Sequence, residues 1–212
     1  MNKTAKILGL SVAALSLAGS YFTTNEVSAK TTTTHITGKK NVKKTSKGTK
    51  YGFKKAFVFS KELQGKWYSN NNLTPEPLEI GKSSLVLPYT SKKAKAVVIG
   101  KVKGTNKYPW QMSGSWKSKH AKAFANIIRG SYKTINQTKW TILSPADEKS
   151  ISVGYAYTTK DEKIDGETIR VVFEALPDNG KVINQYFTSK DLADKYSATK
   201  FTDVTYSDIN LK

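Results

Sequence analysis

The chain has 212 residues, no cysteine and a formal net charge of +19, from 35 lysines and arginines against 16 acidic residues. Without cysteine it can form no disulfide bond and carry out no thiol chemistry, and it lacks the residue that carries the lipid of bacterial lipoproteins. A positive charge of this size attracts polyanions and favours solubility, but it does not determine the fold.

The first 29 residues have the pattern of a secretory signal peptide. Lys3 and Lys6 form a basic start, residues 7–18 are uncharged and apolar or small, and residues 27–29 are small enough for a signal peptidase. The apolar run is too short to remain in a membrane, and no later run of about 20 apolar residues occurs. We therefore predict export, a mature chain that begins near Lys30 with a net charge of +18, and no transmembrane segment.

Residues 30–55 are predicted to form a disordered basic arm. They contain nine lysines and no acidic residue, and much of the rest is threonine, glycine and serine. Such a segment has too few large apolar side chains to offset the entropy lost on ordering. It is either a solvated leader or an adhesive polycation. The candidate polyanion-binding residues are Lys39, Lys40, Lys43, Lys44, Lys47, Lys50, Lys54 and Lys55.

Residues 56–212 are predicted to form one β-rich domain, because short β-branched and aromatic runs alternate with turn-forming residues. The first expected strands cover 63–69, 85–87, 96–99, 108–112 and 132–143.

A three-stranded meander is expected next, with strands at 151–157, 168–176 and 182–187. Asp165-Gly166 and Asn179-Gly180 would form the turns, since type I′ turns need two residues with positive φ.

Two short helices are expected within this domain. Residues 121–128 place apolar side chains at helical spacing, and Gly130 follows where a left-handed C-cap belongs. Residues 189–196 form the second, with Ser189 as its N-cap and with Leu192 and Tyr196 facing inward.

The string Leu63-Gln64-Gly65-Lys66-Trp67-Tyr68 resembles the G-x-W-Y opening of lipocalin and calycin barrels. Similar strings occur in small exported proteins of lactobacilli after a Lys/Thr-rich leader, and the N-terminus resembles the export signals of Gram-positive bacteria. The resemblance implies a single antiparallel barrel-like domain, with Gly65 turning into the first strand, Trp67 plugging one end beside Tyr68, and a small apolar ligand inside. Alternatively, Trp67 is an ordinary core residue. The T-D-Y motif of lipocalins is missing.

Charge is uneven within the domain. Residues 56–142 carry 15 basic and 3 acidic side chains, whereas residues 143–212 carry 9 and 12. Tyr108, Trp110 and Trp116 lie near lysines and would either stack on sugars or bases or belong to the core. The chain has no nucleic-acid-binding motif, so we expect no specific nucleic-acid partner.

No catalytic or metal-binding pattern is present. His35 lies in the arm, and His120 is expected on the solvated face of a helix. As a calcium loop, residues 161–172 would place Lys163 at a ligand position and lack the final glutamate, so a hairpin turn fits better. Glu174 and Asp178 are carboxylates of unknown separation. We therefore predict no enzyme activity, no cofactor and no metal.

These observations favour a noncatalytic secreted protein, held at the cell wall by anionic polymers through its cationic arm. The alternative is a lipocalin-like protein that binds a small hydrophobic ligand.

Overall fold

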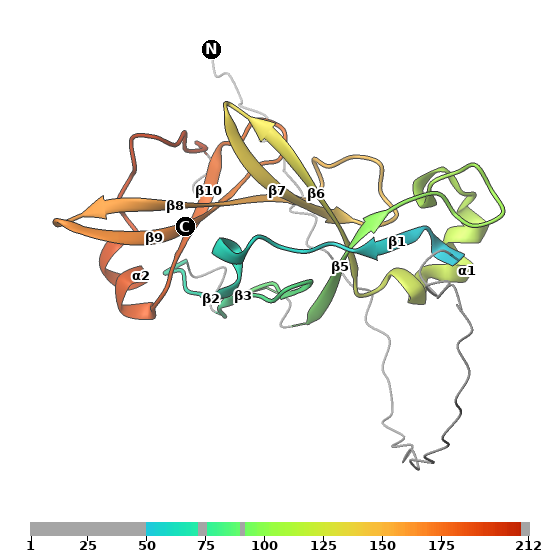
Figure 1. The fold of residues 1–212 in the computed structure, drawn as a ribbon, viewed down its shortest axis with the longest axis horizontal. Coiled ribbons are helices and arrows are strands. Elements are labelled where there is room, and N and C mark those ends of the chain that lie inside the picture. Colours follow the sequence, from blue (N-terminus) through green and yellow to red (C-terminus); the bar gives the residue numbers. More distant parts are fainter. Residues whose placement is uncertain (1–49, 72–75, 90–91, 209–212) are drawn as a thin grey trace, which may run out of the picture. The chain divides into compact units, whose positions relative to one another are not determined.

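A computed structural model describes residues 50–71, 76–89 and 92–208 (Figure 1). The chain divides into two units, residues 1–44 and 45–212, and every described residue belongs to the second. The expected signal peptide, the mature start at Lys30 and most of the basic arm lie outside the described residues.

The described residues form a mainly β fold with two α-helices. In chain order, the strands are β1 (Phe53–Ala56), β2 (Gly65–Trp67), β3 (Leu78–Ile80), β4 (Ser84–Val86), β5 (Lys93–Ile99), β6 (Ile127–Ile135), β7 (Thr138–Pro145), β8 (Tyr155–Ile164), β9 (Glu167–Ala175) and β10 (Val182–Phe187). The helices are α1 (Gly114–Phe124) and α2 (Lys190–Tyr196), with 3-10 helices η2 (Lys61–Leu63) and η3 (Pro109–Gln111). None of the described helices is long and apolar enough to cross a bilayer.

The strands form one sheet in the order β10-β9-β8-β7-β6-β5-β4-β3-β2, and β1 pairs with β5 beside β4. All neighbours are antiparallel except β5 and β6, which are parallel and joined by a crossover that contains α1. The sheet is not closed into a barrel. Its two terminal strands meet at one isolated bridge, where Tyr68 and Phe187 exchange two backbone hydrogen bonds of 2.8 Å.

The predicted C-terminal meander is confirmed by the pairing of β8 with β9 and of β9 with β10. Asp165 and Gly166 both have positive φ, 52° and 85°, as a two-residue hairpin turn requires. The second turn is longer than expected: only Gly180 has positive φ, and the loop closes through a hydrogen bond from Gly180 N to Leu176 O. Strand β8 begins at Tyr155 rather than at residue 151.

Two predicted strands in the middle of the chain are wrong. Residues 132–143 belong to two strands, β6 and β7, because Asn136 and Gln137 both adopt positive φ and turn the chain without a glycine. Residues 108–112 contain η3 instead of a strand. Proline lacks the N–H of a sheet ladder and suits the first turn of a helix, and Pro109 occupies that position.

Helix α1 begins and ends earlier than predicted. Ser113 caps it by accepting a hydrogen bond from Trp116 N, and it ends at Phe124 because residues 127–129 pair with β5. Gly130 is not a helix cap but a buried residue of β6. A Cβ atom at Gly130 would lie 2.3 Å from Phe57 Cγ, so the glycine allows that ring to approach the strand closely.

Helix α2 agrees with its prediction. Ser189 Oγ accepts a hydrogen bond from Leu192 N, Tyr196 is buried, and Leu192 packs half-buried against the same core. That core joins the meander to the helix and to the C-terminal segment, since it includes Phe173, Phe187 and Phe201 together with Tyr196.

Candidate functional site

Three of the eight candidate polyanion-binding lysines are described. Lys50, Lys54 and Lys55 are exposed, and the last two belong to β1. Strand β1 therefore starts three residues before the expected domain boundary at residue 56. The other five, Lys39, Lys40, Lys43, Lys44 and Lys47, lie outside the described residues.

The end of the predicted arm is anchored to the sheet. Lys55 pairs with Val98 of β5, and Phe53 packs edge-on against Phe124 of α1 at a centroid distance of 5.0 Å. Gly100 N donates a 2.7 Å hydrogen bond to Gly52 O. These contacts hold Lys54 and Lys55 against the C-terminal end of β5, beside Val98 and Gly100.

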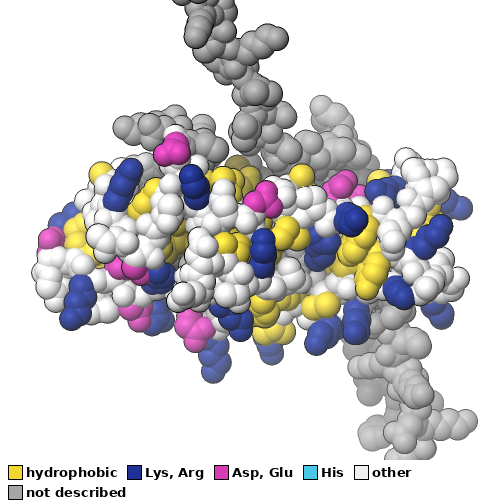
Figure 2. Space-filling model, turned by 90° about the horizontal axis from the view of Figure 1, so that it is seen from above, with side chains coloured by type: hydrophobic (Ala, Val, Ile, Leu, Met, Phe, Trp, Pro, Cys, Tyr) yellow, Lys and Arg dark blue, Asp and Glu magenta, His cyan; other side chains and the backbone are white. Residues whose placement is uncertain are grey.

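We define the cationic region as residues 50–56 and 92–129, which comprise β1, β5, η3, α1 and the start of β6. It contains 13 basic residues and no acidic residue. They are Lys50, Lys54, Lys55, Lys92, Lys93, Lys95, Lys101, Lys103, Lys107, Lys117, Lys119, Lys122 and Arg129. At the end that carries α1, on the right in Figure 2, the visible charged side chains are those of lysine and arginine.

Six ion pairs among the described residues have both partners outside this region. They are Lys66–Glu79, Lys160–Asp203, Asp161–Arg170, Lys181–Asp208, Lys190–Asp194 and Lys195–Asp165. The sequence has no acidic residue between Glu79 and Asp147, so neighbours along the chain do not neutralise the charges of residues 92–129.

Aromatic rings lie within this basic surface. The rings of Tyr108 and Trp110 stack with centroids 4.7 Å apart and planes inclined by 3°. The guanidinium of Arg129 lies 4.9 Å from the centroid of Trp110, and Arg129 Nε donates to Ser144 Oγ at 3.0 Å. Burial lowers the pKa of Arg129, and the negative charge of Glu148 opposes that shift.

The sequence predicts that His120 lies on the solvated face of a helix, but its side chain is half-buried among aromatic rings. Its Nδ1–H donates a 2.7 Å hydrogen bond to Trp116 O, and its ring lies 4.4 Å from that of Trp116 and 5.5 Å from that of Tyr51. These contacts give His120 a packing role between α1 and the chain before β1.

Gly65 and Trp67 begin and end the terminal strand β2, and Tyr68 follows it. Gly65 has a φ of 151°, which side-chain-bearing residues rarely adopt. Trp67 is buried, and its Nε1 donates to Leu63 O at 2.9 Å, as suits either a plug or a core residue. Tyr68 carries the bridge to Phe187 and packs against the core of the meander.

A buried carboxyl group lies on the opposite face of the meander from Phe173. Glu174 is 2% exposed, and its two carboxyl oxygens accept 2.7 Å hydrogen bonds from the hydroxyls of Tyr157 and Tyr186. Burial raises the pKa of Glu174, and the two hydroxyls counteract that shift. Each of the three side chains comes from a different strand, so the cluster ties β8, β9 and β10 together.

Glu174 does not form a carboxylate pair with Asp178, which lies exposed in the loop before β10 and accepts a 2.6 Å hydrogen bond from Ser152 Oγ. The acidic residues around the first hairpin turn are also engaged: Asp161 binds Arg170, and Asp165 accepts a hydrogen bond from the hydroxyl of Tyr196. Within the described ranges, no group of three or more metal-ligating side chains could hold an ion.

Comparison of the chain with protein-family models, with curated proteins and with solved structures gave no match. The resemblance to lipocalin-like exported proteins therefore stays a prediction.

The sequence indicated Tyr108 and Trp110 as candidate binding residues but did not indicate the side chain that holds Trp110 in place. Arg129 lies 19 residues beyond Trp110, and no local pattern indicates that the two side chains meet. The sequence also did not predict that Glu174 is buried, although its neighbours in β9 are apolar. By contrast, the absence of acidic residues between Glu79 and Asp147 can be read directly from the chain.

Proposed function

We propose that this protein is exported, is not an enzyme and binds the anionic polymers of the cell envelope by electrostatic attraction. The binding element consists of the basic arm together with the cationic region into which its last lysines lead. The observation that carries the proposal is that two folded segments, residues 50–56 and 92–129, together contain 13 basic side chains and no acidic one.

Lysine chemistry suits this role. An ammonium group on a flexible stem pairs with phosphate as a point charge and does not need the two-pronged geometry of arginine. Of the 13 basic residues of the cationic region, 12 are lysines. Such a surface binds through many exchangeable contacts, each of which releases counterions, so its affinity falls steeply as salt rises.

The test is extraction of intact cells with rising salt. At about 1 M salt the Debye length is about 3 Å, and charge pairs between the protein and a wall polymer are screened. We expect release of the protein into the wash between about 0.1 and 1 M salt, while a covalently anchored wall protein stays behind as the control. Retention of this protein at 1 M salt would overturn electrostatic binding.

A second candidate is a barrel-like protein that holds a small apolar ligand. It is favoured by the bridge between Tyr68 and Phe187, which draws the terminal strands together next to the buried Trp67. The buried carboxyl of Glu174 counts against a wholly apolar interior. Native mass spectrometry of the purified protein with fatty acids should show a bound mass if this candidate holds, and its absence would remove it.

A further inference from the structure

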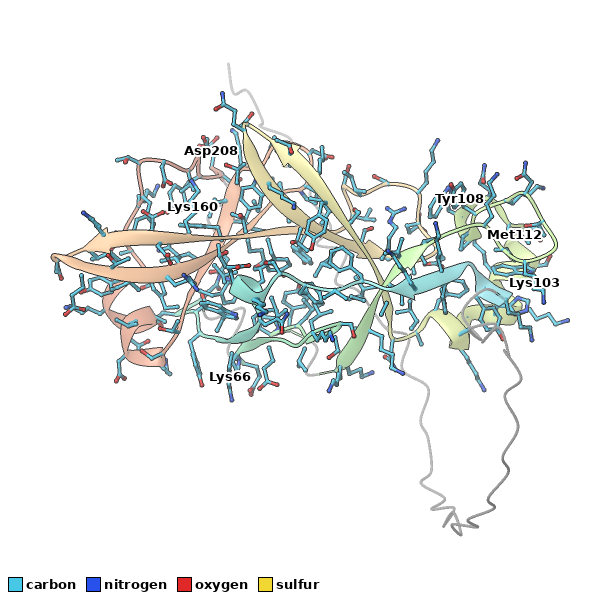
Figure 3. All side chains as sticks on the ribbon, viewed as in Figure 1. Lys66, Lys103, Tyr108, Met112, Lys160 and Asp208 are labelled. Atoms are coloured by element: carbon cyan, nitrogen blue, oxygen red, sulfur yellow. The ribbon has the colours of Figure 1, made fainter. Side chains whose placement is uncertain are left out.

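We propose that the Tyr108–Trp110 ring stack is a sugar-binding platform within the cationic region, so that the preferred partner is a phosphate-bearing glycan. The inference rests on the proposed function, because it names the class of polymer that the cationic region binds. Figure 3 shows Tyr108 at the same end of the fold as Lys103 and Met112.

The four tryptophans of the chain fall into two groups. Trp67 and Trp140 are core residues, 4% and 3% exposed. Trp110 and Trp116 are only partly buried, and both belong to the cationic region. These two large aromatic side chains are partly exposed to water within a surface that attracts anions. Such an arrangement is typical of a binding surface rather than of a core.

The ring stack is ordered before any ligand arrives. Tyr108 precedes η3, and its backbone N–H donates to Gln111 Oε1 while its carbonyl accepts from Gln111 N, both at 2.9 Å. Trp110 is held by Arg129, which is itself fixed by Ser144. Because these rings are already positioned, a ligand that stacks on them loses little free energy to ordering the protein.

The loop that precedes the stack carries lysines. Lys103 and Lys107 are exposed, and a 2.8 Å hydrogen bond from Val102 N to Lys107 O closes the loop between them. A flat ring that directly follows a lysine-bearing loop would offer contacts for the apolar face of a sugar ring, and the loop for a neighbouring phosphate. A polymer that alternates sugars and phosphates matches both.

The same surface is less suited to reading nucleic-acid bases. Arginine is the side chain that contacts guanine edges in a two-pronged manner, and Arg129 is the single arginine of the cationic region. It is engaged by Trp110, by Ser144 Oγ and by the backbone carbonyls of Lys149 and Ser150. Lysines and stacked rings recognise charge and a flat face, without base-edge contacts.

The experiment compares three probes on the mature chain: a soluble poly(hexose phosphate), inorganic polyphosphate of the same charge, and single-stranded DNA. Tyr108→Ala removes the outer ring of the stack, and Tyr108→Leu keeps apolar bulk without a flat ring if the alanine variant fails to fold. The matched control is Tyr132→Ala, since Tyr132 is 46% exposed and lies 4.5 Å from Lys139 Nζ but stands outside the ring stack.

We expect loss of the ring to weaken binding of the poly(hexose phosphate) roughly tenfold, in line with the strength of aromatic stacking, and to leave polyphosphate binding within about twofold. Tyr132→Ala should change neither affinity. Equal losses for both polymers would overturn the sugar platform and leave the proposed function standing. Tighter, Tyr108-dependent binding of DNA would assign the rings to bases instead. If the wild-type chain binds none of the three probes, the proposed function itself fails.

Discussion

The cationic region and the C-terminal meander carry charge in different ways. In the meander and the segment that follows it, basic side chains face acidic ones, as in the pairs Arg170–Asp161 and Lys195–Asp165. The cationic region itself contains no acidic residue, and the acid that acts on its Arg129 is Glu148, from outside the region. The positive charge of the folded part is therefore concentrated in this region.

The two regions therefore differ in how much of their charge is neutralised within the same region. The ion pairs of the meander are exposed, and exposed pairs add little to stability. Their effect is to cancel the field of that part of the surface. The cationic region contains no acidic residue that could cancel its field in the same way, and this positive field is what the proposed polyanion would meet.

We expect the largest difference in polymer affinity between two variants that each lose four positive charges, one from each region. Four lysines of the cationic region change to glutamine in one variant, and four ion-paired lysines change in the other. The first set is Lys54, Lys55, Lys103 and Lys107, and the second is Lys160, Lys181, Lys190 and Lys195.

We expect the first variant to bind a soluble anionic polymer about 10- to 100-fold more weakly at 0.1 M salt, with a shallower dependence of affinity on salt. The second should stay within about threefold of the wild type, because charges more than a Debye length of about 10 Å from the polymer are screened. Titration at several salt concentrations measures both. Equal losses would mean that net charge alone governs binding and that the two regions do not differ.

We expect an intermediate effect from the buried carboxyl group of Glu174, on the free energy of unfolding. Burial raises the pKa of Glu174 above its ordinary value of 4.5, so the unfolded chain ionises first as pH rises. The fold therefore loses stability from about pH 4.5 upward until the folded pKa is passed, by about 1.4 kcal/mol for each unit of the shift.

Glu174→Gln keeps the size of the side chain but cannot ionise; its amide oxygen can accept from one tyrosine hydroxyl, and its amide nitrogen would donate to the other. We expect this variant to gain stability over the wild type as pH rises from 4 to 8, measured by denaturant unfolding. Glu167→Gln makes the same change at an exposed position of β9 and serves as the control. A constant difference between Glu174→Gln and the wild type across that range would contradict the assignment.

The smallest expected effect is that of an ion pair at the surface of the meander. Hydrogen bonds from Arg170 lower the pKa of Asp161, so the stabilisation from this pair is present above the ordinary carboxyl pKa and lost as pH falls through the lowered one. Both side chains are about half exposed, 45% and 48%. Asp161→Asn should leave both the unfolding midpoint and polymer binding unchanged within measurement precision; a clear loss of either would show that the paired charges contribute more than neutralisation.

Features that depend on neighbours along the chain follow directly from the amino-acid sequence. The hairpin turn at Asp165-Gly166 follows from the backbone freedom of these residues, and the Ser189 cap of α2 from a side-chain oxygen placed three residues before Leu192 N. The alternation of the meander and the run without acidic residues were also readable, because they are properties of composition and spacing.

Contacts between segments that lie far apart in the chain depend on the tertiary fold. The apolar residues near Ile128 fit a helix locally, but they pair with β5 and β7 and belong to β6. The single bridge at the sheet edge, the contact of Arg129 with Trp110 and the enclosure of Glu174 likewise depend on strands that meet from far apart in the chain. Long-range packing sets these contacts, and a local pattern cannot encode which partner it will meet.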